Sequence, residues 1–340
     1  MKALLKLKPE PGLLLEEVPL PICGDQDVLI KIETTGICGT DLHIYDWNDW
    51  AQKTIPLPLI VGHEFMGKVE SIGKEIVHLK AGDRVSGEGH ITCGLCRLCR
   101  SPKRHLCPYA KGIGIQRDGS FAEYICLPAQ NVIRVPQDIP DDIAAILDPI
   151  GNAVHTVHSA DVVGEDVLVT GAGPICLMVI ALLKQLGAHS ITVTDINPFR
   201  LALAKKMGAT NVINIRETDL KAIDNLKPEN GFTVGFEMSG KAMAIQTQLS
   251  LLAPGSTLAV LGVSEKNLNI DWNQVVLKGL NIKGIYGREL FETWVKMSAL
   301  LQIGLNLSPL ITHHFSYQNF QQAFKMSKSG EAGKVLLHWT

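Results

Sequence analysis

The segment 171–176, with the sequence Gly-Ala-Gly-Pro-Ile-Cys, restricts the fold of this chain more than any other feature of its sequence. It follows an apolar run at Asp166–Thr170 that predicts a buried strand, and it opens an apolar stretch at Ile175–Leu186 that predicts a helix. This order is typical of dinucleotide binding, because the glycines let a pyrophosphate approach the backbone at the positive end of the helix. Cys176 replaces the third glycine of the pattern, which normally lets the helix pack closely against the strand.

An acidic residue follows the first two glycines, Gly171 and Gly173, at the distance that the pattern requires. Asp195 directly follows a second predicted strand, Ile191–Thr194, and lies 24 residues after Gly171. A carboxylate there can accept hydrogen bonds from the ribose hydroxyls and would repel a 2′-phosphate, so we expect NAD rather than NADP. Arg200 could favour NADP, but we expect it to reach around the adenosine or to pair with Asp195. The alternative interpretation is a glycine turn in an ordinary α/β sheet, which would not need the acidic residue.

After about residue 161 the sequence alternates between strand and helix patterns. Such alternation predicts a parallel sheet covered by helices, the doubly wound α/β class. Further strands are expected at Val212–Asn214, Phe232–Phe236, Thr257–Leu261 and Leu280–Lys283, and further helices at Pro198–Met207 and Met243–Leu252. From about Phe291 a long helix is expected to lead to a last strand at Lys334–Leu337.

The first 150 residues instead contain short β-type runs separated by glycine and proline, for example at Val28–Ile32, Gly67–Ile72 and Phe121–Ile125. This pattern predicts a barrel-like β domain.

The composition of the chain is that of a globular protein, with 46% hydrophobic and 19% charged residues among its 340 residues. The net charge of −2, without a long basic run, argues against nucleic-acid binding. Because the sequence contains neither a membrane-spanning apolar stretch nor a secretory signal pattern, we expect a cytoplasmic protein with no membrane partner.

Four of the eight cysteines lie within fifteen residues, at Cys93, Cys96, Cys99 and Cys107. Their spacing suits a tetrahedral zinc ion, and four thiolates leave no open coordination position, so we expect a structural site that folds a loop around the ion. An iron–sulfur cluster and a zinc-ribbon DNA-binding module are the alternatives. The β-rich surroundings, which lack a basic pattern, favour structural zinc.

A second possible metal site is divided between two short motifs. Cys38 lies in the segment 36–43, Gly-Ile-Cys-Gly-Thr-Asp-Leu-His, and His63 and Glu64 lie in the segment 62–67, Gly-His-Glu-Phe-Met-Gly. One thiolate, one imidazole and one carboxylate could bind zinc and leave a position for water or substrate, as in catalytic sites. Taken singly, each residue has a plainer interpretation: a small buried cysteine, a core histidine and a surface charge.

In this order, the motifs resemble the zinc-containing medium-chain alcohol dehydrogenase family over nearly the whole chain. The resemblance rests on the segment 62–67, the Gly-Asp-Arg-Val segment 82–85, the four-cysteine loop and the glycine turn. The stretches 37–45, 86–94 and 283–289 resemble the branch of this family that oxidises L-threonine. The family's fold implies a GroES-like β-barrel catalytic domain at 1–150, completed by 295–340, and an NAD-binding Rossmann domain at 151–294. A cytoplasmic homotetramer is implied as well.

The resemblance also implies roles for individual residues. Cys38, His63 and Glu64 would hold a catalytic zinc ion, with Asp148 as a further ligand or a nearby acid. Thr40 and His43 would pass the proton of the alcohol to solvent. Besides the glycines, contacts with NAD are implied for Ile175, Asp195, Arg200, Gly262, Val263, Ser264, Tyr286 and Gly287.

The implied reaction is oxidation of L-threonine at its 3-hydroxyl to 2-amino-3-oxobutanoate, with NAD and two zinc ions per chain. Zinc would act as a Lewis acid on the hydroxyl, and the zinc-bound alkoxide would lose a hydride to the nicotinamide. One alternative is the same chemistry on another secondary alcohol, such as a polyol or butanediol. Another is a non-catalytic NAD-binding or zinc-scaffold protein, which would not need Cys38, Thr40 or His43.

Overall fold

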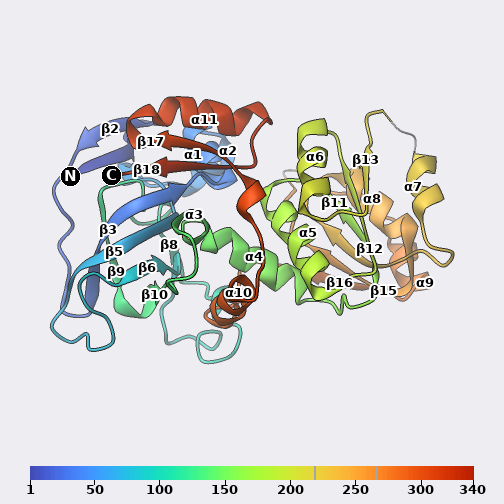
Figure 1. The fold of residues 1–340 in the computed structure, drawn as a ribbon, viewed down its shortest axis with the longest axis horizontal. Helices are drawn as coiled ribbons and strands as arrows, with labels where there is room; N and C mark the ends of the chain where they lie inside the picture. Colours follow the sequence, from blue (N-terminus) through green and yellow to red (C-terminus); the bar gives the residue numbers. More distant parts are fainter. Residues whose placement is uncertain (218–219, 265–266) are drawn as a thin grey trace. The chain divides into compact units, whose positions relative to one another are not determined.

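The computed structural model describes residues 1–217, 220–264 and 267–340 (Figure 1). Its internal contacts divide the chain into two compact units. The first comprises Met1–Pro149, Glu289–Ile303 and Ile311–Thr340, and the second comprises Ile150–Arg288 and Gly304–Leu310. In Figure 1 the first unit contains both the blue strands of the N-terminus and the red strands of the C-terminus, so both ends of the chain build it. Among the described residues, no helix is long and apolar enough to cross a membrane.

Strand β3 (Asp27–Gly36) is the centre of the main sheet in the first unit. It pairs antiparallel with β5 (Glu64–Ile72) along one edge, and its other edge pairs with β9 (Tyr124–Pro128) and then with β18 (Lys334–His338). From β5 the sheet continues through β6 (Arg84–Gly87) to β10 (Val132–Arg134), and from β18 it continues to β17 (Ile311–Ser316). Alternate residues of β3 point into the core, because successive side chains of a strand face opposite sides.

Smaller sheets and short helices complete the first unit. One sheet joins β1 (Lys2–Lys6), β2 (Leu14–Glu17) and β4 (Leu59–Ile60), and a second joins β7 (His90–Ile91) and β8 (Lys111–Gly112). The helices are α1 (Gly39–Asp46), α2 (Asp49–Thr54), α3 (Asp141–Ala144), α10 (Glu292–Gln302) and α11 (Phe320–Ser329). Phe324 of α11 packs into the core, where its ring lies 4.8 Å from that of Tyr45 and meets Phe121 edge-on at 6.2 Å.

Two features of the first unit differ from the sequence prediction. The strand expected at Phe121–Ile125 begins only at Tyr124, because the backbone of Phe121 bonds to Val61 and Leu4 in a connecting segment instead. The chain after Phe291 does not pass from a helix straight to the last strand, since α10, β17 and α11 all precede β18. The prediction missed β17 and α11.

The second unit contains six parallel strands in the order β13-β12-β11-β14-β15-β16. This is the strand order of the Rossmann fold, which confirms the predicted class. The strands are β11 (Asp166–Thr170), β12 (Ser190–Asp195), β13 (Asn211–Asn214), β14 (Phe232–Glu237), β15 (Leu252–Val260) and β16 (Asn281–Gly284). The helices are α5 (Pro174–Leu186), α6 (Pro198–Met207), α7 (Leu220–Leu226), α8 (Ala242–Leu251) and α9 (Trp272–Leu277), while α4 (Leu147–Val157) begins in the first unit and ends in the second.

Local signals set the ends of the two helices that follow β11 and β12. Asn197 caps α6 by accepting a hydrogen bond from the Arg200 amide, and Gly208 ends the helix in the left-handed conformation. Gly187 ends α5 in the same way. Figure 1 shows α5 and α6 on one side of the sheet and α8 and α9 on the other.

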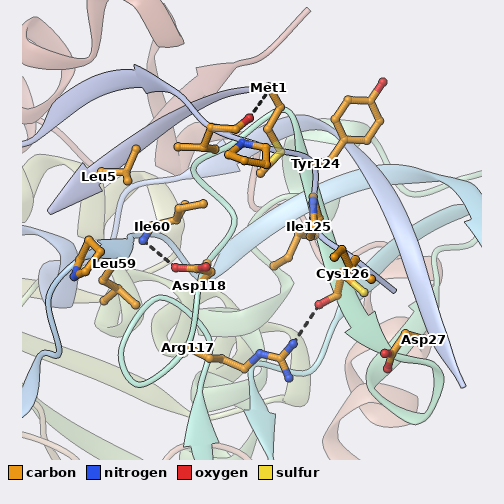
Figure 2. Close-up of a pocket in the computed structure, with 16 residues that line it drawn as sticks. Met1, Leu5, Asp27, Leu59, Ile60, Arg117, Asp118, Tyr124, Ile125 and Cys126 are labelled. Carbon is orange, nitrogen blue, oxygen red and sulfur yellow. Dashed lines mark hydrogen bonds between the residues drawn. The ribbon is translucent and has the colours of Figure 1, made fainter. Parts of the chain in front are cut away.

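A disulfide joins Cys23 to Cys126, 103 residues apart, and the sequence analysis did not predict it. Beside it the first unit contains a cavity of about 470 Å³ (Figure 2). At this cavity Asp118 accepts a hydrogen bond from the Ile60 amide, and Arg117 donates one to the Cys126 carbonyl. None of the residues predicted to bind a metal ion or NAD lines it.

Candidate functional site

The residues of the predicted catalytic metal site meet at one end of the β3–β5 pair. Gly36 lies opposite Glu64 in the antiparallel register, so Cys38, just beyond β3, is brought beside His63, just before β5. One ligand atom each from Cys38, His63 and Glu64 lies within 4.8 Å of the other two. A Cβ atom on Gly36 would stand 2.3 Å from Oε2 of Glu64, so only glycine leaves room for that carboxylate.

Lys334 reaches the same place from the C-terminal strand. Strand β18 pairs with β3 so that Leu336 lies opposite Gly36. The Lys334 ammonium donates to Oε1 of Glu64 at 2.6 Å, to its Oε2, and to the Ile37 carbonyl at 3.0 Å. Burial alone would lower the pKa of Lys334, but the charges of Glu64 and Cys38 raise it above its ordinary value. The ammonium therefore stays charged although its side chain is only 3% exposed.

His63 lies among anionic groups. Its Nδ1 is 3.5 Å from Oδ1 of the buried Asp41, and neither atom makes a hydrogen bond within the described part of the chain. The other carboxylate oxygen of Asp41 accepts a hydrogen bond from the Cys38 amide at 2.9 Å. Burial opposes a positive charge on His63, yet the charges of Asp41 and Cys38 raise the pKa of its imidazole well above the usual value. The surroundings of His63 thus favour a cation.

These residues fit a metal ion of the catalytic type. Thiolate, imidazole and carboxylate are usual zinc ligands, and three protein ligands leave one position open. Asp41 lies against Nδ1 of His63, as an outer carboxylate does when it orients a metal-binding imidazole. The sequence analysis missed Asp41, although it lies inside the motif that contains Cys38.

The other predicted catalytic residues are Thr40, His43 and Asp148. Thr40 and His43 lie three residues apart on α1, which begins directly after Cys38, so both face the same side of the helix. His43 is exposed, and its Nδ1 lies 2.9 Å from Nδ2 of Asn48.

Asp148 lies near Glu64. Burial raises the pKa of Glu64, the charge of Lys334 opposes this rise, and the nearby charge of Asp148 adds to it. Asp148 is therefore a close acid, but it is not one of the three residues whose ligand atoms converge.

The four predicted cysteines of the loop converge as a group. Sγ of Cys93 lies 3.8 Å from that of Cys99 and 3.6 Å from that of Cys107, and Sγ of Cys96 lies 3.8 Å from that of Cys107. Four sulfurs bound tetrahedrally at about 2.3 Å from a zinc ion would be roughly 3.8 Å apart. Hydrogen bonds from the amides of Leu95 and Cys96 lower the pKa of Cys93 to about 6, whereas burial and the neighbouring thiols of Cys107 and Cys96 raise the pKa of Cys99 to about 11. The loop fits a closed four-thiolate site.

The glycine turn of the second unit lines a cavity of about 450 Å³ at the carboxyl ends of β11, β12 and β14. Four of the predicted NAD residues line it: Gly171, Gly173, Asp195 and Arg200. Gly171 has a φ of +98°, which favours glycine. The Asp195 carboxylate accepts hydrogen bonds from the amides of Ala172, Ile196 and Asn197. The carboxyl edge of such a sheet is where dinucleotides bind.

Cys176, in place of the third glycine, does not prevent the helix from starting at Pro174. Its side chain is 2% exposed, and its thiol donates to the Gly171 carbonyl at 2.6 Å. Burial raises the pKa of Cys176 well above its ordinary value, so the thiol keeps its proton. The small side chain is therefore accommodated beneath the turn.

The remaining predicted NAD residues lie outside the lining of this cavity: Ile175, Gly262, Val263, Ser264, Tyr286 and Gly287. Gly262 approaches Gly240 so closely that a Cβ atom on it would stand 2.3 Å from the Gly240 nitrogen. Val263 is 90% exposed and Tyr286 59% exposed. Their contacts with NAD stay a prediction.

Family models match most of the chain, and known proteins match its full length. The model of the alcohol dehydrogenase GroES-like domain matches residues 24–137, and that of the zinc-binding dehydrogenases matches residues 174–302. An L-threonine 3-dehydrogenase of Chromobacterium violaceum is 55% identical over 340 residues, the full length of both chains.

Solved structures agree with these matches. Galactitol-1-phosphate dehydrogenase from Escherichia coli has a TM-score of 0.92 and 29% identity, over 99% of this chain and 100% of that one. A short chain alcohol dehydrogenase from Escherichia coli CFT073, in complex with NADH, has a TM-score of 0.90 and 28% identity, over 100% and 99% of the two chains. The chain therefore belongs to the zinc-binding alcohol dehydrogenase family, in the branch of the L-threonine 3-dehydrogenases.

Proposed function

We propose that this protein oxidises L-threonine at its 3-hydroxyl to 2-amino-3-oxobutanoate and reduces NAD. The 55% identity over the whole chain to an L-threonine 3-dehydrogenase carries the proposal. It is supported by the convergence of Cys38, His63 and Glu64 at a largely buried place in the first unit and by the cavity beside Asp195 in the second. The proposal includes a catalytic zinc domain at 1–150 and 295–340, an NAD-binding domain at 151–294, a cytoplasmic location and a homotetramer.

The residues of the chain would divide the work of the reaction. Cys38, His63 and Glu64 would hold one zinc ion, and Cys93, Cys96, Cys99 and Cys107 would hold a second, structural one. When bound, the first ion supplies a Lewis acid and NAD supplies the hydride acceptor. Thr40 and His43 would lead the proton of the substrate hydroxyl to solvent, to which His43 is exposed. Lys334 would hold the Glu64 carboxylate in place.

The substrate is tested by comparing alcohols at equal concentration with zinc-replete protein and NAD. L-Threonine carries an ammonium and a carboxylate beside its hydroxyl, so its site must contain partners for both charges. Alcohols without these groups leave such partners unpaired, and we expect their kcat/KM to be lower by roughly 10⁴-fold in strong cases. Faster oxidation of sorbitol or 2,3-butanediol would refute the threonine assignment and favour a polyol or butanediol dehydrogenase.

The two metal sites are distinguished by one matched pair of variants, Cys38→Ser and Cys99→Ser. A hydroxyl is a much weaker zinc ligand than a thiolate, so each variant should retain about one zinc ion of the two expected per chain. Cys38→Ser should lose activity, whereas Cys99→Ser should lose more stability than Cys38→Ser does, because structural zinc contributes folding free energy. Zinc content by mass spectrometry and thermal unfolding check both. The assignment is wrong if Cys38→Ser without its zinc ion still turns over.

Asp195→Asn should relax the preference for NAD over NADP by about tenfold or more. The variant removes the repulsion between the Asp195 carboxylate and the 2′-phosphate of NADP. Two like charges about 4 Å apart near a protein surface repel each other by roughly 4 kcal/mol, and about 1.4 kcal/mol already changes a binding constant tenfold. The amide keeps an oxygen that can accept the hydrogen bond from the Ala172 amide. The measurement is the ratio of Kd values for the two cofactors, with the exposed Asp224→Asn of the same unit as a control. An unchanged ratio would mean that Asp195 does not face the ribose.

His43→Asn should lower turnover by about 10²-fold or more, the usual scale for loss of a general base, while zinc content and NAD affinity stay unchanged. The amide preserves a hydrogen-bonding side chain but cannot titrate. His78→Asn serves as the control, because His78 is exposed and is not one of the proposed site residues. Wild-type turnover in His43→Asn would exclude the proton relay, and loss of zinc would instead make His43 a ligand.

A further inference from the structure

A third group of possible metal ligands lies in the first unit and has no part in the proposed reaction. It consists of Asp142 on α3, His314 on β17 and His338 on β18, and we call it the His–His–Asp cluster. One ligand atom from each residue lies within 4.8 Å of the other two. The three residues come from parts of the chain far apart in sequence, and the folded sheet brings them together.

The sheet register determines how the two imidazoles face each other. Strands β17 and β18 run parallel with His314 opposite Leu336, so His314 and His338 project from the same face, two residues apart along the ladder. Their rings are stacked at 5.3 Å with an angle of 8° between the planes. Nδ1 of His314 lies 3.0 Å from Nε2 of His338, while Nε2 of His314 lies 3.9 Å from a carboxylate oxygen of Asp142.

Thr34 orients the second imidazole. It lies opposite His338 in the antiparallel β18–β3 pair, and its hydroxyl is 3.3 Å from Nδ1 of His338. When Nδ1 carries the proton and donates to this hydroxyl, the lone pair of Nε2 is directed to His314. Metal-binding histidines are oriented in this way by a partner on their second nitrogen.

We propose that the His–His–Asp cluster binds one divalent transition-metal ion through His314, His338 and Asp142, in addition to the two zinc ions of the proposed function. Two imidazoles and a carboxylate favour Ni²⁺, Cu²⁺ or Zn²⁺ over Mg²⁺ and Ca²⁺, which prefer oxygen ligands. The 3.0 Å contact between the two rings is a hydrogen bond, which an ion held by both imidazoles would replace.

The cluster is distinct from the group around Cys38. His338 lies four residues beyond Lys334 on β18, which corresponds to about 13 Å along a strand. His314 is 46% exposed and Asp142 41% exposed, so an ion can reach the cluster from solvent. A bound ion would join α3 to the C-terminal strands, and it would therefore stabilise the folded state, the more so the higher its free concentration relative to its Kd.

The test is titration of the untagged, zinc-replete protein with Ni²⁺ in a calorimeter, followed by measurement of nickel and zinc by mass spectrometry. We expect one additional nickel ion per chain with no loss of zinc. His314→Asn and His338→Asn should each weaken its binding more than about tenfold, since even the loss of an outer partner costs 10- to 100-fold. Asp142→Asn should weaken it as well, and the exposed His78→Asn should leave it unchanged.

Thermal unfolding provides a second measurement that does not depend on any enzymatic activity. Ni²⁺ should raise the unfolding temperature of the wild-type chain and of His78→Asn but not of His314→Asn. Circular dichroism and zinc content establish that each variant is folded. The proposal is overturned if no extra nickel binds, if nickel merely displaces zinc, or if the histidine variants bind it as the wild type does. Because the readout is metal binding alone, these results do not depend on whether the protein oxidises L-threonine.

Discussion

The pairing of strand β3 with segments from three distant parts of the chain is the constraint on which the first unit depends. Strand β5 takes one edge of β3, and β9 and β18 share the other. At the end of β3, Gly36 lies opposite both Glu64 and Leu336. The backbone ladder that holds the sheet together therefore also sets the positions of Cys38, Glu64 and Lys334. A slip of one residue would turn every side chain of a strand to the opposite face and disperse the group.

The register of these strands buries charged side chains that would destabilise the fold if they had no partner. Glu64 and Asp41 are fully buried, and Lys334 nearly so. A buried ion costs several kcal/mol unless partners compensate for the lost water, and pairing it often restores little more than that cost. Lys334 compensates Glu64, and the Cys38 amide donates to Asp41. An apolar cluster of the same size would stabilise the fold at least as well, so the charges are better explained by a chemical role than by stability.

The helices and strands of the second unit can be predicted from neighbouring residues to a greater extent than those of the first unit. The predicted helix Pro198–Met207 and the predicted strand Asp166–Thr170 have the same bounds in the structure. A side-chain cap at Asn197 and a left-handed glycine at Gly208 are properties of adjacent residues, so a reader of the sequence can find them. The same holds for the four cysteines of the loop, because their short spacing alone brings the thiols together.

The sequence by itself determined the two architectures, the glycine turn with its acidic partner, and the residues of both zinc-type ligand groups. Only the tertiary structure decided which groups surround them. Lys334 lies 270 residues from Glu64 in the sequence. Strand β17 and helix α11 are stabilised by the sheet and the core that they complete. His314, His338 and Asp142 meet only once β18 has paired with β3. The physical reason is that hydrogen bonds within a helix or turn join near neighbours, whereas the register between distant strands depends on which buried faces fit together.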